Sequence, residues 1–243
     1  MNDAVIWHEL ECGSYHQDLP LWLALAGECG GPVLDIGAGT GRVAGALARA
    51  GYQVTALDRD PQLLAELARR ADEVPLPLQT VLRDAREFDL GSLFALVIVP
   101  MQTVQLLGGQ AGRRAFLRCA LRHLRPAGVL AIAIATALEC FELADGEPGP
   151  LPDVSERDGF VYFSQPTAVR RDGRSDGFVL ERRREIVSPA GERTCSEDRI
   201  TLDRLSVGRL QREAADVGLW AAGVRRIAPT FEHVGSEVVM FGA

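Results

Sequence analysis

The sequence predicts an α/β fold, in which a doubly wound seven-stranded sheet carries N-terminal cover helices and a small antiparallel β insertion. Three observations lead to this prediction. From Val33 onward, short runs of aliphatic and β-branched residues alternate with longer segments of helical period, which is typical of a mostly parallel sheet. A further helix and two more strands are predicted at the end of the chain. Between them, residues 139–203 are richer in proline, glycine and charge and break the alternation.

The predicted elements of the sheet follow one another in a regular order. Strands are predicted over Val33–Ile36, Gln53–Leu57, Leu78–Leu82, Phe94–Val99, Val129–Ala135, Ala222–Ile227 and Glu237–Phe241. Helices are predicted over Thr40–Ala50, Pro61–Ala71, Arg113–Leu124 and Ser206–Val217. Pro61 stands in a first helical turn, where proline is favoured, and Gly218 follows the last helix, where glycine commonly ends one.

This pattern divides the chain into three parts. Residues 1–31 are expected to form a helical cover, 32–138 and 204–243 the sheet domain, and 139–203 a β-rich insertion that covers the substrate. The cover holds several aromatic and histidine side chains in apolar surroundings, namely Trp7, His8, Tyr15, His16 and Trp22. Such a segment suits packing over the sheet edge where ligands bind.

One hairpin in the insertion is predicted down to its register. Pro189-Ala190-Gly191 forms a three-residue loop with glycine in the left-handed position. The facing residues are then Phe178 with Leu202, Leu180 with Ile200, Glu181 with Arg199, Arg182 with Asp198, and Arg183 with Glu197. Apolar residues face apolar ones and opposite charges face each other, so the arginines favour an ion-paired hairpin over a nucleic-acid or phosphate patch.

Composition excludes several kinds of chemistry. The chain has 26 basic and 33 acidic residues, a formal charge of −7, and every basic residue is arginine. Without lysine, it has no side chain for a Schiff base, a pyridoxal-phosphate anchor or a P-loop phosphate contact. The acidic balance argues against nucleic acid as a partner, because such binding depends on neutralising phosphates.

Neither a targeting segment nor a metal motif is apparent. Met1–Glu11 carries acids where a signal peptide needs positive charge, so a cytoplasmic location is expected. The longest apolar runs are far shorter than the roughly 18–20 residues of a membrane span, so no membrane partner is expected. The five cysteines are scattered without Cys-x-x-Cys spacing, which predicts reduced, structural thiols.

A glycine loop follows the first strand and predicts a Rossmann-like nucleoside site. Gly37-Ala38-Gly39-Thr40-Gly41 leads into a helix, and Asp58 ends the second strand about 20 residues later, where it can accept from ribose hydroxyls. Arg42 replaces the last glycine of a dinucleotide motif, and Asp35 would repel a pyrophosphate but suits an ammonium group. With Asp84-Ala85 placed after the third strand to accept from an adenine amine, these residues predict adenosine joined to an amino acid.

From Val33 to about Ala135, the chain resembles class I S-adenosylmethionine-dependent methyltransferases motif by motif. The resemblance implies S-adenosyl-L-methionine as cofactor and a set of contacts to it, namely Asp35, Gly37, Ala38, Gly39, Asp58, Arg59, Asp84, Ala85, Pro100 and Met101. In similar proteins an N-terminal tyrosine commonly reaches the cofactor, which makes Tyr15 a candidate; the alternative is a tyrosine that only packs within the cover.

The closer resemblance is to small-molecule methyltransferases of actinobacterial natural-product pathways, which combine an aromatic cover with a β insertion. Enzymes that methylate base amines usually carry an Asn/Asp-Pro-Pro-aromatic stretch after the fourth strand, whereas this chain has Val99-Pro100-Met101-Gln102. Catechol-type relatives bind a divalent metal through carboxylates in this region, and Val97–Leu107 has none. No metal is therefore predicted.

The expected reaction is methyl transfer to N, O or S of a small organic acceptor, such as a secondary metabolite, by a positioned in-line displacement. The acceptor pocket is predicted between the Pro100-Met101-Gln102 turn, the cover around Tyr15 and His16, and the insertion near Tyr162. Gln102 would orient the nucleophile or a water. His16 and His233 are the candidate bases for a hydroxyl or thiol acceptor, whereas a neutral amine needs none.

Two other functions stay open at this point. An oxidoreductase could bind NAD on the same sheet, although the position of Gly41 and the charge of Asp35 disfavour it. A non-catalytic domain could bind the cofactor as a partner in an assembly. The sequence also leaves a homodimer open and does not identify the acceptor.

Overall fold

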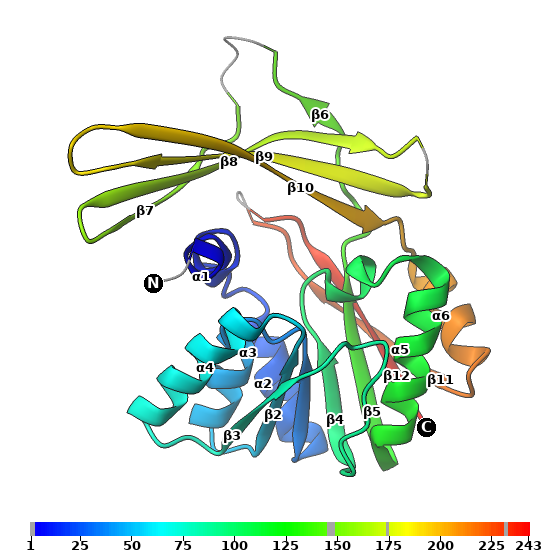
Figure 1. The fold of residues 1–243 in the computed structure, drawn as a ribbon. Coiled ribbons are helices and arrows are strands. Elements are labelled where there is room, and N and C mark those ends of the chain that lie inside the picture. Colours follow the sequence, from blue (N-terminus) through cyan, green and yellow to red (C-terminus); the bar gives the residue numbers. More distant parts are fainter. Residues whose placement is uncertain (1–2, 145–148, 174, 231–232) are drawn as a thin grey trace.

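The central sheet of the protein has seven strands. A computed structural model describes residues 3–144, 149–173, 175–230 and 233–243. The strands lie in the spatial order β11-β12-β5-β4-β1-β2-β3 (Figure 1). Their bounds are β1 (Val33–Ile36), β2 (Val54–Asp58), β3 (Leu78–Leu82), β4 (Phe94–Val99), β5 (Leu124–Ile134), β11 (Trp220–Ile227) and β12 (Ser236–Gly242). β12 runs antiparallel to both of its neighbours, and the other pairs are parallel, which confirms the predicted doubly wound α/β fold.

Helices cover both faces of this sheet. One face packs against α2 (Leu19–Cys29), α3 (Arg42–Arg49) and α4 (Pro61–Glu73). The other packs against the 3₁₀ turn η2 (Thr103–Leu106), α5 (Gly109–His123) and α6 (Val207–Ala215). Within the described ranges, no helix has the length and apolar character needed to cross a membrane.

Several element boundaries differ from the prediction, and three of the differences have a structural cause. α3 begins at Arg42 rather than Thr40, because Gly41 before it has a left-handed backbone with φ of 87°. α5 begins at Gly109, whose N–H donates to the distant Asp203 carboxylate at 2.8 Å, a contact that no local pattern reveals. β5 begins at Leu124, which pairs with Phe94 across an irregularity in the strand register.

The insertion forms a second, antiparallel sheet above the carboxyl ends of the central strands (Figure 1). Its strands are β6 (Phe141–Glu142), β7 (Asp153–Arg157), β8 (Phe160–Arg171), β9 (Gly177–Val187) and β10 (Arg193–Asp203). They lie in the order β10-β9-β8-β6, and β7 also pairs with β8. The segment is thus β-rich, as expected.

The hairpin of β9 and β10 has the predicted register. Glu181 faces Arg199 and Arg182 faces Asp198, and Gly191 in the turn has a φ of 82°. The directly facing charges do not pair as expected, however. Arg184 reaches Asp198 diagonally at 3.0 Å instead, because long side chains on a twisted sheet reach diagonal neighbours.

One side chain holds the two ends of the insertion together. The Gln105 side-chain amide donates to the carbonyl of Ala135, where β5 has just ended, and to that of Asp203, where β10 returns, while its Oε1 accepts from the Ala135 N–H at 2.8 Å. Beside it, Arg113 is buried and pairs with Glu213 at 2.7 Å as well as with Asp203. The insertion therefore leaves and re-enters the sheet domain at one polar joint.

The first part of the N-terminal segment, α1 (Asp3–His8) and the π-helical turn η1 (Glu9–Gly13), lies between the two sheets (Figure 1). The following helix, α2, packs on a face of the central sheet. In η1, Glu9 pairs with Arg70 of α4 at 3.1 Å, whereas Glu11 pairs with Arg184 of β9 at 2.8 Å. One short turn thus joins the cover both to α4 of the sheet domain and to the sheet of the insertion.

Candidate functional site

A large cavity lies where the sheet edge, the cover and the insertion meet. Its volume is about 690 Å³, within the range of roughly 300–1,000 Å³ usual for small-molecule sites. Side chains from the carboxyl ends of β1, β2 and β4 and from the loop after β3 form its floor, and residues of β8, β9 and β10 form its roof. This is the position expected for a ligand of an open α/β sheet.

Most residues predicted for the site line this cavity. They are Tyr15, Asp35, Gly37, Ala38, Asp58, Arg59, Asp84, Ala85, Pro100, Met101, Gln102 and His233. Gly39 lies behind the lining, His16 is exposed outside it, and Tyr162 packs edge-on against Trp7 with ring centroids 5.6 Å apart. The structure therefore does not bring His16 or Tyr162 to the cavity.

The glycine loop is shaped by contacts within the protein. Gly37 has a φ of 72°, and a Cβ there would lie 2.5 Å from the Thr103 methyl carbon. Gly39 has a φ of 55°, and a Cβ there would lie 2.3 Å from Nε2 of His8. Neighbouring side chains and a left-handed backbone therefore require glycine at these two positions.

Asp58 organises the loop from the end of β2. One carboxylate oxygen accepts from the Gly39 N–H at 2.8 Å, and the other accepts from the Asp60 N–H at 2.9 Å. A carboxylate has about four acceptor positions, so capacity is left for ribose hydroxyls. Asp58 is therefore placed both to hold the glycine loop and to bind a nucleoside.

Asp35 is the most unusual acid in the cavity. Its side chain is 1% exposed, and neither oxygen has a hydrogen-bond partner of normal geometry within the described part of the chain. Burial raises the pKa of Asp35 to about 7, against the lowering influence of the Arg42 guanidinium and the Ala44 amide, and nearby Asp58 raises this pKa further. A buried, unpaired carboxyl group at a cavity wall suits a cationic ligand group.

The third acid, Asp84, already has a partner. Arg86 donates to Asp84 at 2.6 Å, and this hydrogen bond lowers the pKa of the Asp84 carboxyl. Charge-paired in this way, Asp84 stays ionised and keeps acceptor capacity for an amine on the cavity side.

The turn after β4 has strained backbone. Met101 has a φ of 55°, which is unusual for a residue other than glycine. Thr103 Oγ1 donates to the Pro100 carbonyl at 3.0 Å and holds the turn against the glycine loop. Such strain is often found where a site must be held in one geometry.

Arg42 is a site residue whose role was not predicted. Its guanidinium donates to the Tyr15 carbonyl and to the Asp18 carboxylate, each at 2.7 Å, and lies 5.1 Å from the Tyr15 ring centroid. Tyr15 in turn stacks on His233 with centroids 4.8 Å apart. The replacement of glycine by Arg42 was visible in the sequence, but its partner Asp18 could only be found in three dimensions.

His8 and Cys12 of the cover also line the cavity, although neither was predicted as a site residue. Nδ1 of His8 lies 3.3 Å from Thr40 Oγ1, and burial lowers the pKa of this imidazole. Burial raises the pKa of the Cys12 thiol to about 11, so it stays protonated. The roof adds Arg182, Arg184 and Asp198, which were predicted only as hairpin residues.

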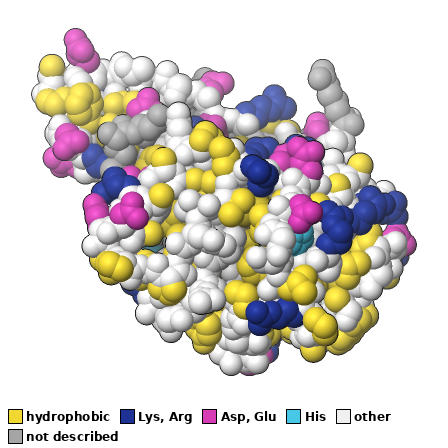
Figure 2. Space-filling view, turned by 60° about the horizontal axis from the view of Figure 1, so that its bottom comes forward, with side chains coloured by type: hydrophobic (Ala, Val, Ile, Leu, Met, Phe, Trp, Pro, Cys, Tyr) yellow, Lys and Arg dark blue, Asp and Glu magenta, His cyan; other side chains and the backbone are white. Residues whose placement is uncertain are grey.

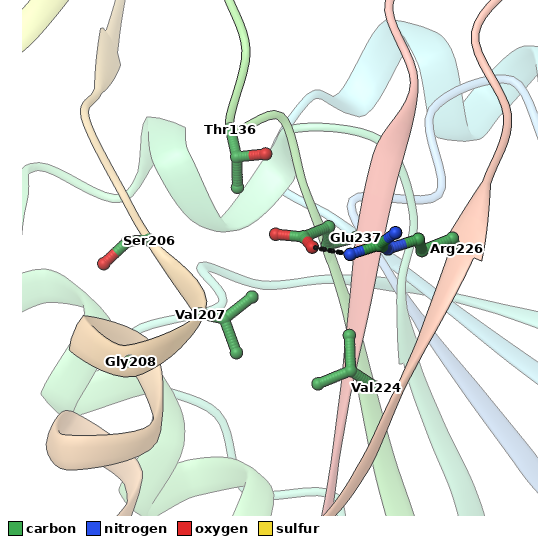
Figure 3. Close-up of a pocket in the computed structure, with 7 residues that line it drawn as sticks. All are labelled: Thr136, Ser206, Val207, Gly208, Val224, Arg226 and Glu237. Atoms are coloured by element: carbon green, nitrogen blue, oxygen red, sulfur yellow. Dashed lines mark ion pairs between the residues drawn. The ribbon is translucent and has the colours of Figure 1, made fainter.

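Other parts of the surface give weaker evidence of a binding site. A groove of about 640 Å³ lies beside β11, β12 and the start of α6, and Arg226 and Glu237 form an ion pair of 3.6 Å there. Figure 3 shows the side chains that line it. The groove contains none of the predicted site residues. The face in Figure 2 carries acidic and basic side chains in small groups between hydrophobic ones. Among the described residues, no cluster of three or more potential metal ligands occurs.

Comparison with known proteins agrees with this geometry. Residues 33–128 match a family model described as a methyltransferase domain. The cypemycin N-terminal methyltransferase of a Streptomyces species is 32% identical over 136 residues, which is 56% of this chain. The match spans 54% of that relative's length.

Solved structures share the whole fold. KedS8, a sugar N-methyltransferase from a Streptoalloteichus species, has a TM-score of 0.73 and 18% identity, covering 98% of this chain and 93% of its own. CalS10 is an amino pentose methyltransferase from Micromonospora echinaspora that was solved with S-adenosylmethionine bound. Its TM-score is 0.70 and its sequence identity 20%, and the match covers 99% of this chain and 98% of CalS10. The CcbJ methyltransferase from Streptomyces caelestis has a TM-score of 0.69 and 21% sequence identity, and the match covers 95% of this chain and 91% of CcbJ. Residues 33–128 thus match a methyltransferase domain, and the fold of the described chain is the one that these solved methyltransferases share.

Proposed function

We propose that the protein transfers a methyl group from S-adenosylmethionine to a small organic acceptor. The observation that carries the proposal is the convergence of Asp35, Gly37, Asp58 and Asp84 on one cavity at the carboxyl ends of the strands. Three acids around a glycine loop fit a nucleoside that carries an ammonium group better than a pyrophosphate. The insertion and cover close the cavity above.

The residues present fit this cofactor. Asp35 offers an unpaired carboxyl group to the ammonium, Asp58 offers acceptors to the ribose, and Asp84 offers one to the adenine amine. When bound, the cofactor would supply a methyl group on a sulfonium sulfur; the acceptor would attack the methyl carbon in line with the carbon–sulfur bond, and the sulfur would leave as a neutral thioether. The chain's own task is to position the acceptor and exclude water, and its roof and cover serve that task.

Nitrogen is the acceptor atom that we favour among N, O and S. The cypemycin relative acts on an N-terminus by name, and KedS8 is described as a sugar N-methyltransferase. A neutral amine needs no strong base. His233 is the one candidate base of the prediction that lines the cavity, and its stacking on Tyr15 supports a role in shaping the pocket.

Calorimetry with S-adenosylhomocysteine and with NAD tests the cofactor. We expect binding of the former and none of the latter; the reverse would favour the oxidoreductase. Tritium transfer from methyl-labelled S-adenosylmethionine to a panel of amines, alcohols and thiols tests the reaction. If positioning dominates, His233→Ala should reduce the rate by less than about 100-fold. Complete loss of turnover with cofactor affinity intact would point to a hydroxyl or thiol acceptor activated by His233.

A further inference from the structure

The roof of the cavity has an apolar end and a charged end. Alternation along β9 directs Phe178, Leu180, Arg182 and Arg184 to the cavity face, since residues two apart share one side of a strand. From β10, Leu202 and Ile200 extend the apolar end, and Asp198 extends the charged end. The charged end lies against Glu11 and Cys12 of the cover.

The two arginines of this roof differ in how fully they are paired. Arg184 donates to both oxygens of Glu11 at 2.8 Å and also pairs with Asp198 at 3.0 Å. It is therefore saturated with carboxylates. Arg182, one step along the same face, has a single ion pair among the described residues, to Asp153 at 4.0 Å. That distance is too long for a hydrogen bond.

Arg182 is also shielded from solvent. Its side chain is 17% exposed, and it lies among Glu11, Cys12 and Asp198 at the cavity wall. A guanidinium presents five N–H donors in a planar fork that matches a carboxylate. Arg182 lines the cavity, and its guanidinium has no hydrogen bond of normal geometry to another side chain of the described residues. Asp198 faces Arg182 in the strand register, but its ion pair is with Arg184 at 3.0 Å and not with Arg182.

On the basis of the proposed methyl transfer, we propose that the acceptor carries an anionic group, a carboxylate, that Arg182 binds in the roof. The apolar part of the acceptor packs under Leu180 and Ile200. The methylated amine lies below, toward the Met101-Gln102 turn. Arg182 thus determines specificity without touching the reacting atoms, and the preferred substrates are amines that also bear a negative charge.

Matched ligands test this proposal. Calorimetry on the chain saturated with S-adenosylhomocysteine compares 4-(aminomethyl)benzoate with 4-(aminomethyl)benzamide, and 6-aminohexanoate with its amide. We expect each carboxylate to bind at least about tenfold more tightly than its amide, as a charge-assisted bidentate contact requires. The matching aryl phosphate forms a separate arm; if it is preferred over the carboxylate, the anion is a phosphate and the carboxylate assignment is wrong.

The neighbouring arginine supplies a control. Arg183 lies on the opposite face of β9 and its side chain is 60% exposed, so Arg183→Gln should keep the preference. Arg182→Gln should abolish it while leaving S-adenosylhomocysteine affinity unchanged, and Arg182→Lys should retain part of it because the charge stays but the fork is lost. Should Arg182→Gln fail to fold, Arg182→Lys tests the proposal on its own: a partial loss of the carboxylate preference supports it, and an unchanged preference contradicts it.

Several results would overturn the inference. They are equal binding of acid and amide to the wild type, a preference that survives Arg182→Gln, or no binding of any anionic probe. If S-adenosylhomocysteine itself does not bind, the proposed function fails instead. The two failures are therefore distinguishable in one titration series.

Discussion

The floor and the cover of the cavity are built by different interactions. On the floor, Asp58 hydrogen-bonds the backbone of Gly39 and Asp60, which lie within about 20 positions of it in the chain. The cover is held by arginine–carboxylate pairs such as Glu11 with Arg184, which are 173 positions apart. The floor thus depends on local backbone geometry, and the cover on long-range charge pairing.

This difference separates two tasks. A floor made from backbone and strand ends can bind one cofactor while the side chains above it vary. A cover built from side-chain pairs can change its acceptor through a few substitutions. Substitutions in the floor should therefore affect cofactor binding, and substitutions in the cover should affect the acceptor. The two groups should also differ in the size of their effects.

The largest effect is expected at Asp35. Its folded-state pKa of about 7 lies above the usual value of 3.8 for Asp, so the folded state binds the proton more tightly. The free energy of unfolding of the ligand-free protein should fall as pH rises from about 4 to about 7 and then level off, by about 4 kcal/mol in all. Asp35→Asn should remove this slope in urea denaturation and be more stable than the wild type at pH 8.

Asp72→Asn, on the exposed face of α4, is the matched control and should keep the slope. Asp35→Asn should also weaken S-adenosylmethionine binding, since the neutral amide cannot balance an ammonium. An unchanged slope in Asp35→Asn would assign the pH dependence to another group.

Asp58→Ala comes next. Loss of its hydrogen bonds to the loop and to the ribose should weaken S-adenosylhomocysteine binding by about 1.5–3 kcal/mol in calorimetry, the scale of hydrogen bonds to a charged acceptor. Asp72→Ala should bind like the wild type. Unchanged affinity in Asp58→Ala would remove this residue from the nucleoside site.

Glu11→Gln tests the cover. It leaves Arg184 without its closest charge partner in a largely shielded position, so the free energy of unfolding should fall by about 1–2 kcal/mol. Glu28 forms a similar bidentate pair with Arg225, but on the exposed surface of the sheet domain. Glu28→Gln should leave the urea midpoint unchanged; an equal loss in both variants would show that burial does not distinguish the pairs.

The smallest effect is expected at His16, which is exposed and outside the cavity lining. His16→Ala should change the methyl-transfer rate by no more than about twofold, as for most surface substitutions. A larger loss, with cofactor affinity intact, would mean that the cover moves to bring His16 into the site.

Sequence reasoning reached the floor because its signals are local. The strand, glycine loop and Asp58 follow a short pattern with a mechanism, and the register of the β9–β10 hairpin follows from its turn. The roles of Arg42 and Glu11 could not be predicted, since their partners Asp18 and Arg184 are brought near only by folding. The contact of His8 with the glycine loop could not be predicted either, because a single histidine in a helix gives no sign of the loop it packs against.

The joint at Gln105 has a consequence for how such a protein diversifies. One amide holds Ala135 and Asp203 side by side, so the chain between them begins and ends at nearly the same point. An insertion of different length or sequence can therefore replace this one without changing how the two ends are joined to the sheet domain. Loop length alone adds little entropic cost. The insertion, which we propose covers the acceptor, can therefore be exchanged as a unit, so that evolution changes the substrate while the proposed cofactor site in the sheet domain is kept.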